Sequence, residues 1–228
     1  MTSIDPGTAV APTRVLHRQT VLHLAVAHAV RRDLARLTRV LGDPVTAVRR
    51  DALAAHVTFL LDQLADQHRV LDCAVWPLAA ARQPALADLL ERVELAHSRL
   101  VQPVVRARSA ALRWRSAPDA RAAVLDAVRD LDVALAPVLA QDAELLPLAC
   151  AALPATVTVS GEPSRPGRPT RLARRMFWLL DDLDLPTAEL FLQRTPRIVM
   201  WVLRNGFSGG YNRAAYLMWV GGGTGPAV

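Results

Sequence analysis

The sequence predicts an all-α protein, an up-down four-helix bundle followed by a helical C-terminal extension. Apolar residues make up 52% of the 228 residues and aromatic residues only 5%, a balance that favours packed helices over a β-sandwich. Apolar positions recur at spacings of three and four over four long segments, so each segment has one core-facing stripe. The length suits one domain with an appendage.

The first predicted helix covers residues 13–41 and carries His23 and Ala27 on its inner stripe. Residues 42–44, Gly-Asp-Pro, then supply C-cap, N-cap and N1 chemistry in order. This sequence is expected to end the first helix and begin the second.

The second predicted helix covers residues 45–80, and the polar Gln67 lies in the middle of its apolar stripe. A polar side chain at that position points to where a polar ligand could be held. His56 lies eleven residues earlier, about 20° away on the helical wheel, and so faces the same way about three turns up. The neighbouring members of the stripe are Val57, Leu60, Leu64, Leu71, Ala74 and Leu78.

The third predicted helix covers residues 84–115 and has His97 on its apolar face. Pro103 lies inside this helix and must kink it or start a new turn, because proline removes an internal hydrogen bond. The fourth predicted helix covers residues 116–151, and its apolar stripe continues to Asp142.

The predicted bundle therefore spans residues 13–151, and two further segments follow it. Residues 152–170 are rich in Pro, Gly and Ser and form a linker with no room for a core. Residues 171–220 hold most of the aromatic side chains and are predicted to form two or three shorter helices packed on the bundle as a lid. An amphipathic membrane anchor is the alternative for this extension.

Charge and cysteine spacing exclude several function classes. The net charge of +6 comes from arginines spread over every helix, which indicates a solvated surface and no nucleic-acid partner. The N-terminus lacks the apolar core of a signal peptide, and no uncharged apolar run approaches the ~20 residues that span a bilayer. We therefore expect a cytoplasmic protein without a transmembrane segment. Cys73 and Cys150 fit no metal-binding spacing and are predicted to be buried, reduced thiols.

Short motifs in all four predicted helices resemble the hemerythrin-like (HHE cation-binding) family, in particular its actinobacterial members. Residues 67–78 contain QHRVLD followed by Trp-Pro-Leu, in the frame of the family's HHxxED and Trp-Pro-Leu. Residues 27–34, AHAVRRDL, resemble its first-helix signature, and residues 96–100, AHSRL, resemble its third-helix EHxxL. Residues 146–148, LPL, match the end of its fourth-helix motif. The resemblance covers essentially the whole chain, with a looser match in the extension.

The family binds two non-haem iron ions through His and carboxylate ligands from all four helices, and the resemblance implies where those ligands would fall. The positions are Ala27, Gln67, Leu71, His97, Val138 (or Pro137) and Asp142 (or Gln141). Apolar side chains cannot ligate and neutral Gln is a poor ligand for iron, so the diiron site is predicted to be lost. Apolar periodicity favours Val138 and Asp142, because both then lie on the buried face. His28 lies one residue out of register with the first-helix ligand.

We therefore expect a degenerate metal site with no metal and no cofactor, whose cavity binds a small organic molecule. The protein would be a small-molecule-binding protein or a metal-independent enzyme. His97 is the candidate catalytic residue, because a buried His near a carboxylate has acid–base potential. The expected lining of the cavity is His23, Ala27, His56, Gln67, Leu71, Val138 and Asp142.

Two alternatives stay open. The polar residues of the stripes could be structural, each hydrogen-bonded and fixing the register of the helices. Otherwise a rearranged site could hold iron for oxygen binding, redox sensing or oxidation. His23 and His56 face inward, but their heights along the bundle are not expected to bring them to a common ion with His97. No oligomeric state is predicted.

Overall fold

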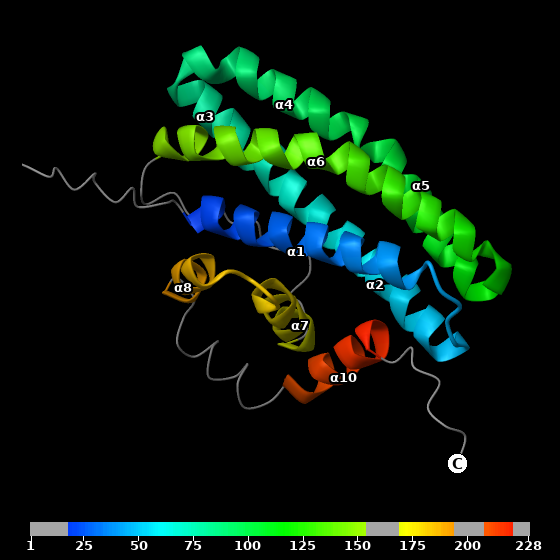
Figure 1. Cartoon of the computed structure of the whole chain (residues 1–228). Coiled ribbons are helices and arrows are strands. Elements are labelled where there is room, and N and C mark those ends of the chain that lie inside the picture. The colour runs from blue at the N-terminus through cyan, green and yellow to red at the C-terminus, as the bar shows by residue number, and fades with distance from the viewer. Residues whose placement is uncertain (1–17, 154–168, 194–207, 221–228) are drawn as a thin grey trace, which may run out of the picture.

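Every regular element in the described part of the chain is a helix, so the all-α prediction is confirmed. The computed structural model describes residues 18–153, 169–193 and 208–220 (Figure 1). The α-helices are α1 (Arg18–Val40), α2 (Ala47–Val70), α3 (Trp76–Arg82), α4 (Ala87–Arg99), α5 (Val101–Ser116), α6 (Arg121–Ala151), α7 (Pro169–Leu180), α8 (Leu185–Gln193) and α10 (Ser208–Trp219). The shorter elements are the π-helical turn η1 (Leu71–Val75) and the 3₁₀ turns η2 (Pro84–Leu86) and η3 (Pro118–Ala120).

Helix α2 begins later than the sequence predicts. Its N-cap is Thr46, whose side-chain oxygen accepts a hydrogen bond from the backbone N–H of Arg49 at 3.3 Å. This bond satisfies one of the free donors of the first turn, so the helix starts at Ala47. The prediction that Asp43 and Pro44 begin this helix is therefore wrong.

The second predicted helix is interrupted by the π-helical turn η1. Within it, the backbone N–H of Trp76 donates to the carbonyl of Leu71, five residues earlier. Pro77 follows directly, and it disfavours an α-helical turn because it has no N–H and its ring crowds the carbonyl four residues before it. The wider turn ends the apolar stripe early. Leu71 is buried, whereas Leu78, which periodicity assigns to the stripe, is 39% exposed.

The third predicted helix is broken at Leu100, between α4 and α5. Pro103 occupies the first turn of α5, where a missing N–H removes no intrahelical bond. The break agrees with the prediction that this proline starts a new turn. It leaves His97 in the last turn of α4.

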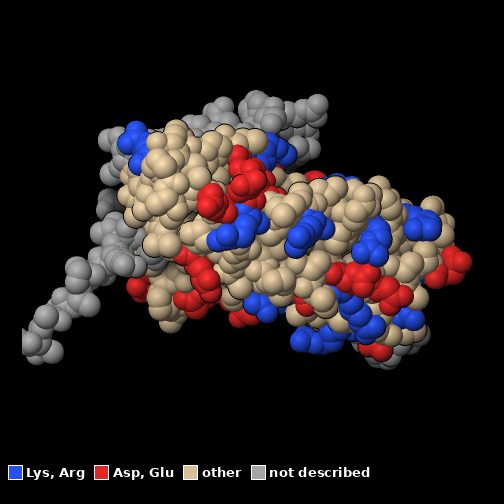
Figure 2. Space-filling view, turned by 90° about the horizontal axis from the view of Figure 1, so that it is seen from above, with Lys and Arg blue, Asp and Glu red and all other residues tan. Residues whose placement is uncertain are grey.

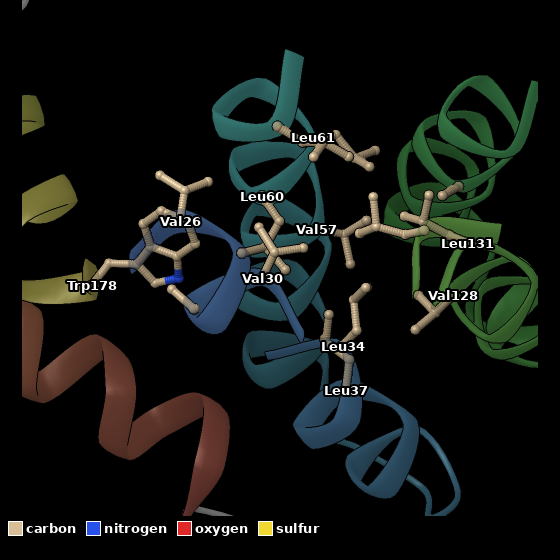
Figure 3. Close-up of a cluster of buried hydrophobic side chains, with 14 of the residues drawn as sticks. Val26, Val30, Leu34, Leu37, Val57, Leu60, Leu61, Val128, Leu131 and Trp178 are labelled. Carbon is tan, nitrogen blue, oxygen red and sulfur yellow. The ribbon is translucent and has the colours of Figure 1, made fainter. Parts of the chain in front are cut away.

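The main core lies where α1, α2, α5 and α6 pack against one another. Figure 3 shows apolar side chains of α1, α2 and α6 pointing toward one another, with the ring of Trp178 from α7 on one side. The labelled residues are all buried: Val26, Val30, Leu34, Leu37, Val57, Leu60, Leu61, Val128, Leu131 and Trp178. A second apolar cluster, which includes Leu71, Trp76 and Leu146, joins η1, α3, α4 and α6.

Helix α6 is the longest of the described helices and packs against α1, α3, α4 and α5. By length and composition alone, the segment Pro118–Ala151 could cross a membrane. The core helix of a water-soluble protein meets the same criterion, so the segment does not by itself indicate a span. The helix also carries Asp142, which is 0% exposed.

The surface mixes charges of both signs. Figure 2 shows arginines interspersed with acidic side chains on the face seen from above, separated by uncharged areas. Cys150 is buried, but Cys73 is exposed. The prediction that both thiols are buried is therefore wrong for Cys73, which lies in η1 between the buried Leu71 and Val75.

The C-terminal helices pack on one side of the core (Figure 1). Helices α7 and α8 contact α1, and α10 contacts α2 and α7. Arg49 of α2 donates from Nε and Nη2 to the backbone carbonyl of Met218 in α10, at 3.1 and 3.0 Å. Most of the predicted linker, residues 152–170, lies outside the described residues.

A buried carboxylate, Asp33 of α1, ties α1 to α2 and α7. Its Oδ2 accepts hydrogen bonds from His56 Nε2 at 2.7 Å and from Trp178 Nε1 at 2.9 Å. Its Oδ1 accepts one from Arg32 Nε at 2.8 Å, and Arg32 also donates to the backbone carbonyls of Trp178 and Asp181. Burial would raise the pKa of Asp33, but these donors lower it to about 2. These residues are named the Asp33 cluster below.

We expect Asp33→Asn to destabilise the protein by about 3 kcal/mol, because the substitution removes the charge on which three buried donors depend. Asp62→Asn is the matched control. Asp62 is exposed and pairs with Arg108 at 2.6 Å, and an exposed pair contributes less than about 1 kcal/mol. Urea denaturation followed by far-ultraviolet circular dichroism measures both variants, and equal losses would contradict the role of Asp33.

Candidate functional site

Three imidazoles and two carboxylates meet inside the helical core. They are His23 from α1, His68 from α2, Asp72 from η1, His97 from α4 and Asp142 from α6, and they are named the His97 cluster. His23, His97 and Asp142 are 1%, 5% and 0% exposed, so these three residues are shielded from water, whereas the Asp72 side chain is 33% exposed. Polar groups at this depth need hydrogen bonds or a bound partner.

His97 is held between the two carboxylates. Its Nδ1 lies 2.7 Å from Asp72 Oδ1, and its Nε2 lies 3.0 and 3.1 Å from the two oxygens of Asp142. The three residues come from separate elements, namely the last turn of α4, the π-helical turn and the interior of α6. The two contacts fix the plane of the imidazole and direct Nε2 toward α6.

His68 and His23 flank this arrangement. The His68 ring stacks on the His97 ring, with centroids 4.1 Å apart and planes inclined by 10°. His23 Nε2 lies 3.8 Å from Asp142 Oδ2, which is too far for a hydrogen bond. Within the described structure, His68 Nε2 and both ring nitrogens of His23 are buried without a hydrogen-bond partner. Each unpaired group of this kind costs about 1–3 kcal/mol.

The three imidazoles differ in protonation. Burial opposes protonation of His97, but the hydrogen bonds and charges of Asp142 and Asp72 raise its pKa to about 9. Burial, together with repulsion from His97, lowers the pKa of His68 to about 4. Burial also lowers the pKa of His23, against the attraction of Asp142. At neutral pH the cluster therefore holds one imidazolium and two neutral imidazoles.

The cluster contains the donor atoms of a metal site. One ligand atom from each of His68, His97 and Asp142 lies within 4.8 Å of the others. Neutral imidazoles and carboxylates are common ligands of divalent transition metals. Asp72 has the position of the outer carboxylate that usually accepts the second N–H of a metal-binding His. A bound ion would also give unpaired ring nitrogens a partner.

Three of the residues predicted from the sequence lie together in this cluster: His23, His97 and Asp142. His23 and His97 lie on either side of Asp142. The group of ligand atoms that could hold one ion consists of His68, His97 and Asp142 and does not include His23 or His56. The fourth helix has the register that apolar periodicity favours, with Val138 and Asp142 buried and Pro137 exposed.

His56, which was expected to line the same cavity, belongs to a different polar cluster. Its Nε2 bonds to Asp33, and its ring makes an edge contact with Trp219, with centroids 5.3 Å apart. His56 joins this other cluster because its hydrogen-bond partner, Asp33, lies on the facing helix α1. At the height of His56, α1 presents the buried carboxylate of Asp33, so the imidazole turns toward it.

Most of the remaining predicted residues lie among apolar side chains. Leu71 and Val138 are members of the two apolar clusters, and Ala27 packs against the larger one. Gln67 is 3% exposed, and its side-chain nitrogen has no hydrogen-bond partner among the described residues. His28 lies apart from the cluster, with its Nε2 at 2.8 Å from a backbone carbonyl between α7 and α8.

His68 and Asp72 are missing from the residues predicted to form the site. Each lies one position after a residue that the family resemblance implies, Gln67 and Leu71. The spacing of four between His68 and Asp72 places them on one helical face, and this spacing is the signal that could have identified them. The π-helical turn that carries Asp72 to His97 has no counterpart in the apolar periodicity.

Stability should depend on pH through His97. Its pKa is raised from 6.5 to about 9, so protonated His97 stabilises the fold fully below about pH 6.5, and this contribution is lost as pH rises through about 9. The contribution is about 3 kcal/mol. We expect His97→Gln to remove this part of the pH dependence and the matched control His28→Gln to keep it. Urea denaturation across the alkaline range measures the slope, and an unchanged slope in His97→Gln would contradict the assignment.

The chain matches no protein-family model, no curated protein and no solved structure. The resemblance to the hemerythrin-like family therefore rests on the short motifs of residues 27–34, 67–78, 96–100 and 146–148. The geometry of the His97 cluster is independent of that resemblance.

Proposed function

We propose that the protein is a hemerythrin-like, up-down four-helix bundle whose core binds one divalent transition metal ion in place of a diiron centre. The proposed ligands are His68, His97 and Asp142, with His23 beside them. Iron is the first candidate metal, and oxygen binding, redox sensing or oxidation is the corresponding function. The proposal rests on one observation: Asp72 holds His97 through Nδ1 while Nε2 of the same ring faces Asp142.

The arrangement of the long helices supports the bundle. Helices α1, α2, α5 and α6 pack against one another, and α4 precedes α5 along the same row (Figure 1). If α4 and α5 are counted as one long helix, each of the four long helices contributes an imidazole or a carboxylate to the cluster: α1, α2, α4–α5 and α6. Metal sites in four-helix bundles are built in this way, from side chains that project inward from facing helices.

The donor set supports a mononuclear site. Two imidazoles and one carboxylate occur together in non-haem iron(II) proteins, where the remaining coordination positions stay open. A metal requires neutral imidazole, and the pKa of about 4 keeps His68 neutral at physiological pH. The charges also suit a cation, because two carboxylates contact the one imidazolium, His97.

Metal binding requires a small movement and the loss of one proton. Two atoms bound to one ion at about 2.1 Å each lie at most about 4.2 Å apart, and the ligand atoms here all lie within 4.8 Å of one another. The His68 and His97 rings are stacked with nearly parallel planes, so the His68 ring has to turn before both rings can direct a nitrogen at one ion. His97 also has to release the Nε2 proton that Asp142 accepts, because a metal binds a free ring nitrogen.

A bound iron(II) ion would supply reversible redox chemistry and an open position for a small ligand. The residues of the chain would control that site. Asp72 fixes the tautomer and orientation of His97 and strengthens it as a ligand. Apolar side chains on η1, α3 and α6, including Leu71, Trp76 and Leu146, exclude water from the same end of the core.

A metal-independent role for His97 is the second candidate. The protonated state of His97 favours this role. Both N–H groups of the ring bond to carboxylates, which keep the imidazole charged at neutral pH. In that role a small organic ligand would displace one of the two carboxylates from His97 and accept the proton of that N–H, since a pKa of about 9 keeps both protons on the ring at neutral pH. Elemental analysis of the purified protein separates the two candidates. One ion per chain supports the first, and no metal with no affinity for added metal supports the second.

Removal of a proposed ligand should weaken metal binding. We expect His68→Ala and Asp142→Asn to lower the affinity for cobalt(II) by at least about a hundredfold, and Asp72→Asn to lower it about 10- to 100-fold. Titration followed by cobalt(II) absorption measures each affinity. The matched control is His28→Ala, which should leave the affinity unchanged. Equal losses in His28→Ala and His68→Ala, or two ions per chain, would contradict the proposed site.

Metal affinity should also rise with pH. Below the pKa of about 9, each ion that binds must displace the Nε2 proton of His97. The affinity should therefore increase about tenfold per pH unit between about pH 6.5 and 9. Calorimetric titration in buffers of different ionisation enthalpy counts the protons released. One proton per ion supports His97 as a ligand, and none excludes it.

A further inference from the structure

A pocket lies between α2, α7 and α10, and it is separate from the His97 cluster. Its volume is about 380 Å³, within the range of about 300–1,000 Å³ that is usual for small-molecule sites. Four alanines and Gly210 form most of its lining, and the larger residues are Arg174, Tyr211 and Met218. Ala55 lines this pocket, whereas His68 lies 13 residues further along α2, about 20 Å away along the helix.

Arg174 supplies the positive charge of this pocket. Within the described residues it is the only charged group in the lining, and no carboxylate lies within ion-pair distance of it. Its guanidinium lies over the ring of Phe59, 4.3 Å from the centroid. Because the Phe59 ring contacts the face of the guanidinium, the N–H donors at the edge of the guanidinium stay free for another partner.

A second arginine beside the pocket also lacks a carboxylate partner in the described structure. Arg49 is 7% exposed, and its guanidinium donates to the uncharged backbone carbonyl of Met218, a lining residue. The pocket therefore combines an apolar wall with an uncompensated positive charge. Such a combination matches a ligand that is both apolar and anionic.

We propose that this pocket binds an amphipathic carboxylate, such as a medium-chain fatty acid, with its tail against the alanines and Met218 and its carboxylate on Arg174. The paired N–H donors of arginine match the two oxygens of a carboxylate. Arg174 is exposed, so a neutral apolar ligand would leave its guanidinium paired only with water. A small inorganic anion would leave the apolar wall in contact with water. An amphipathic carboxylate satisfies both parts, and its binding does not depend on a metal in the His97 cluster.

Decanoate is the probe for this site, and decanol is the matched ligand with the same chain length and no charge. In calorimetric titration of the full chain, we expect decanoate to bind about tenfold more tightly than decanol. Arg174→Gln should remove this preference and leave decanol binding unchanged. Arg213→Gln is the matched control, because Arg213 is exposed on α10 and does not line the pocket. It should keep the preference.

Filling the pocket tests the apolar wall separately. Ala214 lines the pocket from α10, and Ala214→Phe should abolish the binding of both ligands. Ala65→Phe is the control, because Ala65 is exposed on α2 outside the lining. Circular dichroism checks the fold of each variant, and the Arg174→Gln comparison decides the proposal even if Ala214→Phe unfolds.

Three results would overturn the proposal: equal affinity for decanoate and decanol, equal losses in Arg174→Gln and Arg213→Gln, or no decanoate binding up to about 1 mM. A fourth contradicting result is that the protein does not bind decanoate but sediments with phosphatidylglycerol vesicles, and that Arg174→Gln abolishes this sedimentation. That result would assign Arg174 to a membrane surface instead.

Discussion

The pairing of buried carboxylates is the constraint on which the arrangement of the helices depends. Asp142 in α6 is 0% exposed and Asp33 in α1 is 1% exposed, and an unpaired charge at that depth costs several kcal/mol. Each carboxylate is paired with a histidine from a facing helix, His97 for Asp142 and His56 for Asp33. Apolar packing holds the helices together without direction, whereas these hydrogen bonds fix which residues face one another.

The two pairs have different chemical capacities. In the Asp33 cluster, donors from three side chains satisfy the carboxylate, and burial lowers the pKa of His56 despite its bond to Asp33. That cluster joins the C-terminal helices to the core. In the His97 cluster, two carboxylates share one imidazolium, and the neighbouring rings of His23 and His68 keep unpaired nitrogens. In the Asp33 cluster, His56 Nδ1 is also unpaired among the described residues, but that cluster holds a single imidazole. Only the His97 cluster therefore brings several possible metal-binding atoms together.

Apolar periodicity was sufficient to predict the all-α class and the inward positions of His97 and Asp142, because both lie on regular stripes of their helices. It did not predict the late start of α2 or the break at Leu100. It could not predict η1, where the helix departs from 3.6 residues per turn and Asp72 reaches His97. The turn does not account for His68, which precedes it in α2. The family resemblance implied Gln67 and Leu71 at these two positions. Partner choice was also beyond the local pattern. Asp33 bonds to Trp178, which lies 145 residues away, and only tertiary packing brings the two together.

The π-helical turn has a consequence for how this segment evolves and is aligned. Adding one residue to an α-helix rotates everything beyond it by about 100°, and η1 absorbs an extra residue within a single turn. Trp76 therefore stays fully buried on one side of the turn, while Asp72 reaches His97 from within it. A chain that lost one residue here could keep the Trp76 anchor or the His68–Asp72 pair in place, but not both. A sequence without the wider turn would therefore align with this one only through a gap of one residue inside η1. Without that gap, the tryptophan and the polar pair would give registers that differ by one.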